Sequence, residues 1–203
     1  MSGAPDLAAL LGEIRACRHC AGLLPHAPRP VVQAGDTARL VIVGQAPGNR
    51  VHQTGIPWND PSGDRLRAWL QIDRAVFYDP AQVALVPMGF CFPGTDAKGG
   101  DRPPRRECAP LWHDAVFGHL PQERLTLLVG QYAQARYLGR ARKASLTETV
   151  RAWPDYRPEH IPLPHPSWRN TGWLKKNPWF EAELLPDLRA RIACLLAGDD
   201  SDP

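Results

Sequence analysis

Two short loops near opposite ends of the chain carry residue types suited to holding and cleaving a small ligand. Gly44-Gln45-Ala46-Pro47-Gly48 directly follows the apolar run 40–43, and His165-Pro166-Ser167-Trp168-Arg169-Asn170 directly follows the apolar segment 161–164. Each loop is expected to leave the end of a buried strand, which is where ligands bind in open α/β sheets. We therefore expect the two loops to close over a small planar ligand.

The cysteines form a second group with chemical potential. Cys17 and Cys20 make a C-x2-C pair, and Cys91 and Cys108 lie 17 residues apart. Two interpretations of these four residues stay open from their spacing: a metal site holding zinc or an iron–sulfur cluster, or buried unreactive thiols. Cys194 stands alone in the last expected helix and is interpreted as a buried inert thiol.

The elements that must position these residues alternate between strand and helix. Apolar β-branched runs predict strands at 39–44, 83–90, 125–130 and 161–165, with Pro87 near a strand end because it cannot donate a ladder hydrogen bond. Helical spacing predicts helices over 6–16, capped by Asp6, and over 62–71, 103–118, 131–138 and 178–196. This alternation predicts an α/β fold, a three-layer α/β/α sandwich with a central four-stranded parallel sheet.

Length and composition set the class of protein. The 203 residues are 43% hydrophobic and 22% charged, with a net charge of +3. These values fit one soluble domain over 1–203, in which 1–36 holds the first helix and the C-x2-C segment and 198–203 is a disordered tail. No run is long enough to span a membrane and the start lacks a signal-peptide pattern, so a cytoplasmic location is expected. We also expect the protein to be a monomer. The mild basicity permits a nucleic-acid partner without arguing for one.

The order of these motifs resembles the uracil-DNA glycosylase superfamily, most closely its iron–sulfur families four and five. The resemblance covers about residues 14–180. Its pieces are Cys17-x2-Cys20, the 44–48 loop, Gly55-Ile56-Pro57-Trp58, Cys91-Phe92-Pro93, the segment 102–108 ending in Cys108, and His165-Pro166-Ser167. Gln45 stands where family four has Glu, and Pro87 stands where that family has Asn. These departures are compatible with a sister branch.

The resemblance implies a DNA repair enzyme. Such an enzyme hydrolyses the N-glycosidic bond of uracil, or of another deaminated base, in DNA. We expect it to be monofunctional, releasing the free base and leaving an abasic site, because no lysine has a clear role as an amine nucleophile. The four-cysteine pattern implies a structural 4Fe–4S cluster on Cys17, Cys20, Cys91 and Cys108, with zinc as the alternative.

The resemblance also assigns roles to single residues. His165 is expected to donate a hydrogen bond to the base O2, and Asp60 to orient water near the sugar, with Asp64 as the reserve and Gln45 helping to shape the pocket. The expected base-binding residues are Gly44, Ala46, Pro47, Gly48, Trp58 and Gly89. The expected DNA contacts are Ser167, Trp168, Arg169, Asn170 and Lys175.

Simpler structural interpretations compete with three of these roles. Asp60 is also a suitable cap for the helix that starts near Ser62, Trp58 could be a core residue, and His165 could be a strand-end histidine. At the level of function, two alternatives remain open. One is a protein that binds damaged DNA without catalysis, and the other is a hydrolase acting on nucleosides or nucleotides.

Overall fold

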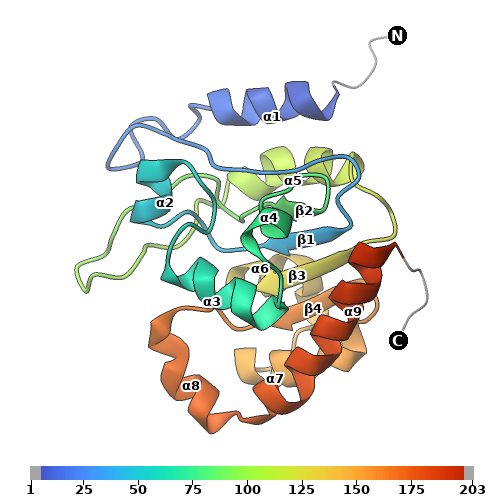
Figure 1. The fold of residues 1–203 in the computed structure, drawn as a ribbon. Helices are drawn as coiled ribbons and strands as arrows, with labels where there is room; N and C mark the ends of the chain where they lie inside the picture. The colour runs from blue at the N-terminus through green and yellow to red at the C-terminus, as the bar shows by residue number, and fades with distance from the viewer. Residues whose placement is uncertain (1–5, 199–203) are drawn as a thin grey trace.

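A four-stranded parallel sheet forms the centre of the computed structural model, which describes residues 6–198. The strands are β1 (Leu40–Val43), β2 (Val83–Leu85), β3 (Leu125–Val129) and β4 (His160–Leu163). They lie in the order β2-β1-β3-β4, which Figure 1 shows from top to bottom. Ile42 of β1 is in register with Leu85 of β2 on one side and Leu127 of β3 on the other. The predicted four-stranded parallel sheet is confirmed.

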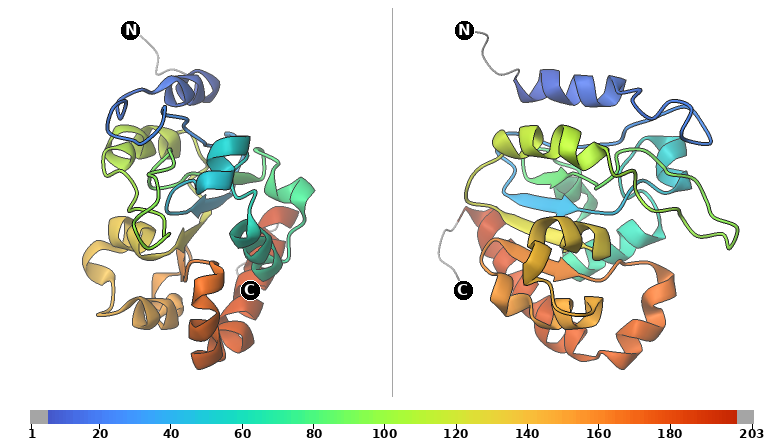
Figure 2. Two further views of the ribbon diagram at one scale, coloured as in Figure 1. Left: turned by 90° about the vertical axis from the view of Figure 1, so that its left-hand side faces the viewer. Right: turned by 180° about the vertical axis from the view of Figure 1, so that it is seen from behind.

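Helices cover both faces of this sheet (Figure 2). Successive residues of β1 point to opposite sides, so Leu40 and Ile42 join one core cluster and Val41 and Val43 join the other. The first cluster packs against α3 (Pro61–Leu70), α4 (Arg74–Phe77), α7 (Leu146–Arg151) and α9 (Leu185–Ala197). The second packs against α1 (Leu7–Ala16), α5 (Cys108–Gly118) and α6 (Gln131–Leu138). The three-layer α/β/α architecture is therefore confirmed.

Shorter elements lie in the connections. Helices α2 (Asn49–Thr54) and α8 (Thr171–Lys176) each follow a loop that leaves the carboxyl end of a strand. Single turns occupy η1 (Gly139–Ala141), η2 (Trp153–Tyr156), η3 (Trp168–Asn170) and η4 (Phe180–Leu184). Sequence patterns missed these elements because each is too short to show a helical period. Between residues 6 and 198, none of the helices combines the length and apolar character that a bilayer crossing requires.

Proline explains where the element boundaries differ from the sequence-based expectation. Helix α5 begins at Cys108 and not at Pro103. A residue that precedes proline is disfavoured in the helical region, so Pro103, which precedes Pro104, is a poor helix start. Strand β2 ends at Leu85, two residues before Pro87. The last helix is preceded by the π-helical turn η4, and Pro186 occupies its first turn.

The two chain ends bear on two further expectations. The Asp6 carboxylate accepts a hydrogen bond from the backbone N–H of Ala9 at 2.7 Å, so the predicted cap of the first helix is confirmed. The expected disordered tail 198–203 lies outside the described residues apart from Gly198, which ends α9.

The strand order creates a natural ligand crevice. From β1 the chain crosses to β2 at one edge, whereas from β3 it crosses to β4 at the opposite edge. The loops that leave the adjacent strands β1 and β3 therefore diverge, and a crevice opens at their carboxyl ends. The 44–48 loop lies at this switch point, and the loop after β4 lies next to it.

Candidate active site

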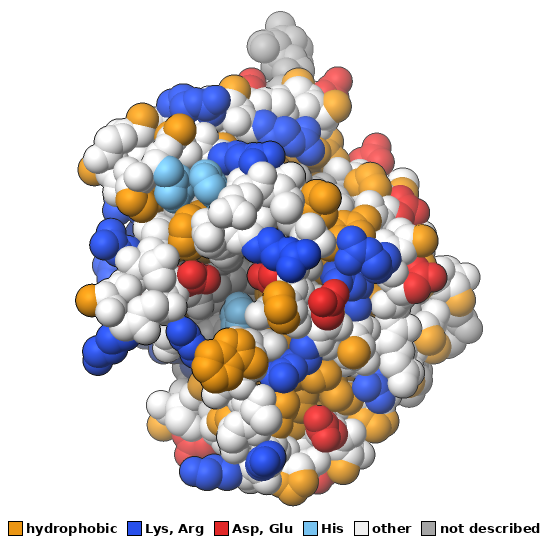
Figure 3. Space-filling model, turned by 60° about the vertical axis from the view of Figure 1, so that its left-hand side comes forward, with side chains coloured by type: hydrophobic (Ala, Val, Ile, Leu, Met, Phe, Trp, Pro, Cys, Tyr) orange, Lys and Arg blue, Asp and Glu red, His pale blue; other side chains and the backbone are white. Residues whose placement is uncertain are grey.

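A cavity of about 120 Å³ opens at the carboxyl ends of the strands. It is lined by the loop after β1, the segment between α2 and α3, residue Asp101 and the loop after β4. Figure 3 shows the hollow with a histidine inside it and acidic side chains at its rim. The two loops that the sequence singled out thus face one another across one cavity.

Most of the expected base-binding and catalytic residues line this cavity. They are Gly44, Gln45, Ala46, Pro47, Gly48, Trp58, Asp60 and His165. Gly89 is the exception: it is buried behind the cavity, and its N–H donates to the carbonyl of Gln45 at 3.0 Å. A Cβ atom at Gly89 would come within 3.0 Å of Pro104, so this glycine permits close packing under the 44–48 loop, and it is not among the residues that line the cavity. Pro87 lines the cavity in its place.

His165 is held so that its ring faces the cavity. The side-chain amide of Asn170 donates to the carbonyl of His165 at 2.7 Å, and the imidazole lies 5.9 Å from the Trp58 ring, centroid to centroid. Burial lowers the pKa of His165, and the carboxylate of Asp60 partly opposes that effect. The ring is therefore neutral at pH 7, and a neutral imidazole can donate one hydrogen bond to a bound ligand.

Trp58 has an unusual backbone conformation. Its φ of 55° lies in the left-handed region, which is costly for a bulky residue. The ring packs directly on Gly44, where a Cβ atom would lie 2.7 Å from it. The carbonyl of Trp58 leaves no room for a side chain at position 63, and Gly63 supplies that space. Both glycines thus serve the placement of one indole beside His165.

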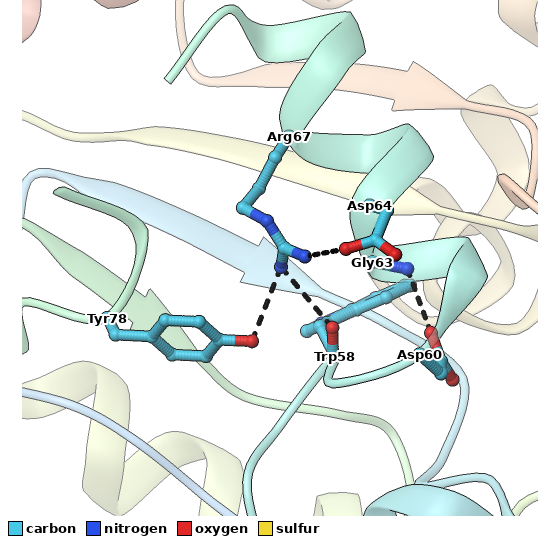
Figure 4. Close-up of polar contacts among 6 residues, drawn as sticks. All are labelled: Trp58, Asp60, Gly63, Asp64, Arg67 and Tyr78. Carbon is cyan, nitrogen blue, oxygen red and sulfur yellow. Dashed lines mark hydrogen bonds and ion pairs between the residues drawn. The ribbon is translucent and has the colours of Figure 1, made fainter. Parts of the chain in front are cut away.

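Arg67 holds the Trp58 turn from behind (Figure 4). Its guanidinium donates to the Trp58 carbonyl and to the Tyr78 hydroxyl, both at 3.3 Å, and it also pairs with Asp64. The group lies over the Phe77 ring at 5.1 Å, and Arg67 is only 6% exposed. A charged group this deeply buried is stable only when its donors are satisfied, so the network fixes the turn.

Asp60 is both a helix cap and a cavity residue. One carboxylate oxygen accepts the N–H of Gly63 at 2.8 Å and caps α3, which is the simpler role considered for it. The other oxygen lies toward Gly48, 3.7 Å from where a Cβ atom at that position would be. Asp64, the reserve candidate, instead pairs with Arg67 outside the residues that line the cavity.

The sequence assigned no site role to Ser62, Asp101 or His113. Ser62 and Asp101 line the cavity, although neither belongs to a recognisable motif. His113 is 1% exposed, and its ring bridges the Pro87 carbonyl at 3.0 Å and the Tyr137 hydroxyl at 2.6 Å. Burial lowers the pKa of His113 to about 4, so this ring is a neutral support for the cavity wall. No local spacing links His113 to Pro87, so only the packing of α5 reveals it.

Of the five expected DNA contacts, Ser167 lines the cavity and the other four do not. Trp168 is 71% exposed, which is rare for so large an apolar side chain. The Ser167 carbonyl accepts a hydrogen bond from Arg65 at 3.0 Å. Arg169 lies against the Trp168 ring and donates to the carbonyl of Gly99 at 2.9 Å, which ties the segment after β4 to the 93–101 loop. Asn170 supports His165, and Lys175 is exposed on α8 outside the cavity lining.

The four motif cysteines converge on a second cavity. Cys17, Cys20, Cys91 and Cys108 all line it, whereas Cys194 does not. Burial and the neighbouring sulfurs raise the pKa of Cys91 to about 12 and that of Cys108 to about 11. Over residues 6–198, no three His, Cys, Asp or Glu side chains are arranged to hold a metal ion. Cys194 is half-buried and lies apart from this group.

The fold and the cavity define a class of protein. The chain is an α/β protein whose ligand cavity sits at the topological switch point and carries an imidazole, an aromatic platform and carboxylates. The family model of the Uracil DNA glycosylase superfamily matches residues 32–189, most of the chain, and the chain belongs to this superfamily. The match includes both loops and the left-handed turn at Trp58.

The role of Arg67 predicts a stability effect. Arg67→Met leaves the Trp58 carbonyl and the Tyr78 hydroxyl without their donor, and we expect it to lower the free energy of unfolding by about 1–3 kcal/mol. Urea unfolding measures this change. Arg74→Met is the matched control, because Arg74 also stacks on Tyr78, at 5.0 Å, but is exposed. Equal stability of the two variants contradicts the assignment.

The electrostatics of His165 predict a titration shift. Its imidazole should titrate below the ordinary value of 6.5, because burial disfavours the charged ring. Asp60→Asn removes the carboxylate that opposes this effect, so the variant should titrate lower still. NMR of the histidine ring signals measures both values. A higher value in the variant would show that the two side chains do not face one another.

Proposed function

We propose that this protein hydrolyses the N-glycosidic bond of uracil, or of another deaminated base, in DNA. It acts as a monofunctional glycosylase that releases the free base and leaves an abasic site. The observation that carries the proposal is the meeting of His165, Trp58 and Asp60 in one cavity, in a chain of the Uracil DNA glycosylase superfamily. The protein is proposed to work as a cytoplasmic monomer.

The chemistry requires stabilisation of two opposite charges. As the bond breaks, negative charge develops on the leaving base and the sugar becomes oxocarbenium-like. The neutral imidazole of His165 donates a hydrogen bond to the base O2, and this bond strengthens as charge develops there. The Asp60 carboxylate faces the sugar, offsets its positive charge and orients the attacking water.

The remaining lining residues hold the base. Trp58 stacks on the base plane, and Gly44 and Gly48 let the backbone approach it closely. Ala46 and Pro47 form the wall between them, and the Gln45 amide shapes the polar edge. Among the described residues that line the cavity none is a lysine, which supports simple hydrolysis without an amine nucleophile.

A base in duplex DNA must leave the stack to reach such a cavity. Trp168, whose ring is exposed, fills the gap that the base leaves, together with Arg169 and Asn170; its exposure supports this role. The Ser167 hydroxyl bonds a phosphate next to the target, and Lys175 adds a phosphate contact farther along the strand. These phosphate contacts make binding sensitive to salt.

We also propose that Cys17, Cys20, Cys91 and Cys108 hold a 4Fe–4S cluster. Four thiols lining one cavity, two of them buried, match the donor set of such a cluster. The raised pKa values of Cys91 and Cys108 mean that these two thiols resist ionisation unless a cationic centre compensates their charge. A bound cluster supplies a structural crosslink between the segment after α1 and the start of α5. Zinc is the alternative occupant.

An oligonucleotide assay tests the glycosylase activity. Strands carrying one uracil, hypoxanthine or xanthine are incubated with excess enzyme, treated with alkali and separated on a gel. We expect alkali-dependent cleavage of at least one strand. His165→Ala should lower the single-turnover rate by about 100- to 1,000-fold, because it removes a donor to the developing anion. Asp60→Asn should be slower by about 100-fold.

The outcomes separate the alternatives. Intact strands from protein that still binds the same DNA indicate a damage-binding protein without catalysis. Cleavage of free nucleosides but not of DNA indicates a small-molecule glycoside hydrolase. Wild-type rates in His165→Ala would contradict the role of the imidazole.

Metal analysis tests the cluster. Protein purified without oxygen should contain about four iron and about four acid-labile sulfide atoms per chain, with a brown colour. Cys17→Ser should lose both iron and colour and lower the melting temperature. Cys194→Ser is the matched control and should retain them, because Cys194 lies outside the cavity. A colourless protein that contains zinc would refute the cluster.

A further inference from the structure

Asp101 is an acidic residue of the cavity that no sequence motif marks. It lies sixty-odd residues before His165, at the end of the 93–101 loop, and it lines the same cavity as Asp60 and His165. Its carboxylate oxygen lies 3.5 Å from the point that a Cβ atom on Gly48 would occupy, and an Asp60 oxygen lies 3.7 Å from that point. Two carboxylates from distant segments thus face one small space beside the backbone of Gly48.

The loop that carries Asp101 is held firmly. Thr95 and Asp101 form an antiparallel bridge, and the Asp96 carboxylate accepts the N–H groups of Lys98 and Gly100 at 2.8 and 2.9 Å. Arg169 fastens the loop to the segment after β4 through the Gly99 carbonyl. These contacts fix the backbone of the loop and do not use the Asp101 carboxylate.

The two carboxylates differ in their hydrogen bonding. Asp60 is committed to the Gly63 N–H through one oxygen and serves as the cap of α3. Within residues 6–198, the Asp101 carboxylate accepts no hydrogen bond. Partial burial and the negative charges of Asp60 and Asp96 raise the pKa of Asp101, whereas Arg169 opposes them. A carboxylate with raised proton affinity and no partner suits a general base better than a capping carboxylate does.

We propose that Asp101 is a catalytic residue that binds the attacking water with Asp60 and accepts its proton. This inference rests on the proposed glycosylase function. The water oxygen forms the bond to the sugar C1′ as the C1′–N bond breaks, and the electron pair leaves with the base, where His165 stabilises it. The water proton passes to the Asp101 carboxylate. The base anion then takes up a proton from solvent, and Asp101 returns its own proton to solvent.

Asp101→Asn is the direct test, measured at saturating enzyme in single-turnover assays on the oligonucleotide that the wild-type protein cleaves. We expect a rate at pH 7 lower by about 100-fold or more, with DNA affinity and melting temperature close to wild type. The wild-type rate should fall on the acid side as Asp101 becomes protonated, and this fall should be absent in the variant. Asp36→Asn is the matched control, because Asp36 is exposed and precedes the amino end of β1.

Gly48→Ala tests the shared water without removing a carboxylate. The added methyl group would lie 3.5 and 3.7 Å from the two acids, an ordinary contact distance, and Gly48 has a φ of −80°, which alanine adopts readily. It fills the proposed water position, so we expect a slower single-turnover rate with the protein still folded.

The double variant Asp60→Asn/Asp101→Asn should be less impaired than the product of the two single effects, because both acids act on one water.

Each outcome decides the inference. If the wild-type protein cleaves a strand and Asp101→Asn matches its rate and pH profile, the role of Asp101 is overturned while the proposed function stands. If Asp101→Asn is slow only because it no longer binds DNA, the residue is structural and the role is again overturned. If the wild-type protein cleaves none of the strands, the proposed function fails and the role of Asp101 fails with it.

Discussion

The central position of β1 is the constraint on which the site depends. All four of its residues are 0% exposed, and it is hydrogen-bonded to β2 on one side and β3 on the other. A strand fixed on every side gives the loop that follows it little freedom. The carbonyls of Gly44 and Gln45 continue the pairing by accepting the N–H groups of Met88 and Gly89, at 2.8 and 3.0 Å. The cavity wall is thus an extension of the sheet, and the switch point between β1 and β3 gives it an open side.

A second constraint is the left-handed turn at Trp58. Backbone strain of this kind persists only where the surroundings over-determine it. Here the indole rests on Gly44, the carbonyl fills the space that Gly63 leaves, and Arg67 binds that carbonyl from the core side. The strained conformation therefore places an aromatic face beside His165. Helix α3 starts just after this turn. Asp60 caps it, and Arg67 belongs to it. One helix start serves packing and the proposed chemistry together.

The two cavities are connected through the segment that precedes α5. Pro104 packs on Gly89 beneath the 44–48 loop, and four residues later Cys108 lines the cysteine cavity. From the same helix, His113 reaches the Pro87 carbonyl in the wall of the other cavity. Helix α5 thus contributes to both places. A metal centre bound by the four cysteines would stabilise helix α5, and through it the wall of the ligand cavity.

The sequence by itself determined the fold class, the strand order along the chain and most of the cavity lining. Buried parallel strands appear as continuous apolar runs, and the residues that follow them in sequence also follow them in space, so Gly44 to Gly48 and His165 could be located from local pattern alone. Asp101, His113 and Arg67 could not be located in this way. Each of these residues reaches its place through contacts between segments far apart in the chain. Such contacts leave no periodic pattern in the sequence. Likewise, the sequence offered Asp60 as either a cap or a catalytic acid, and only the tertiary structure shows that one carboxylate caps α3 and also lines the cavity, because its two oxygens face different neighbours.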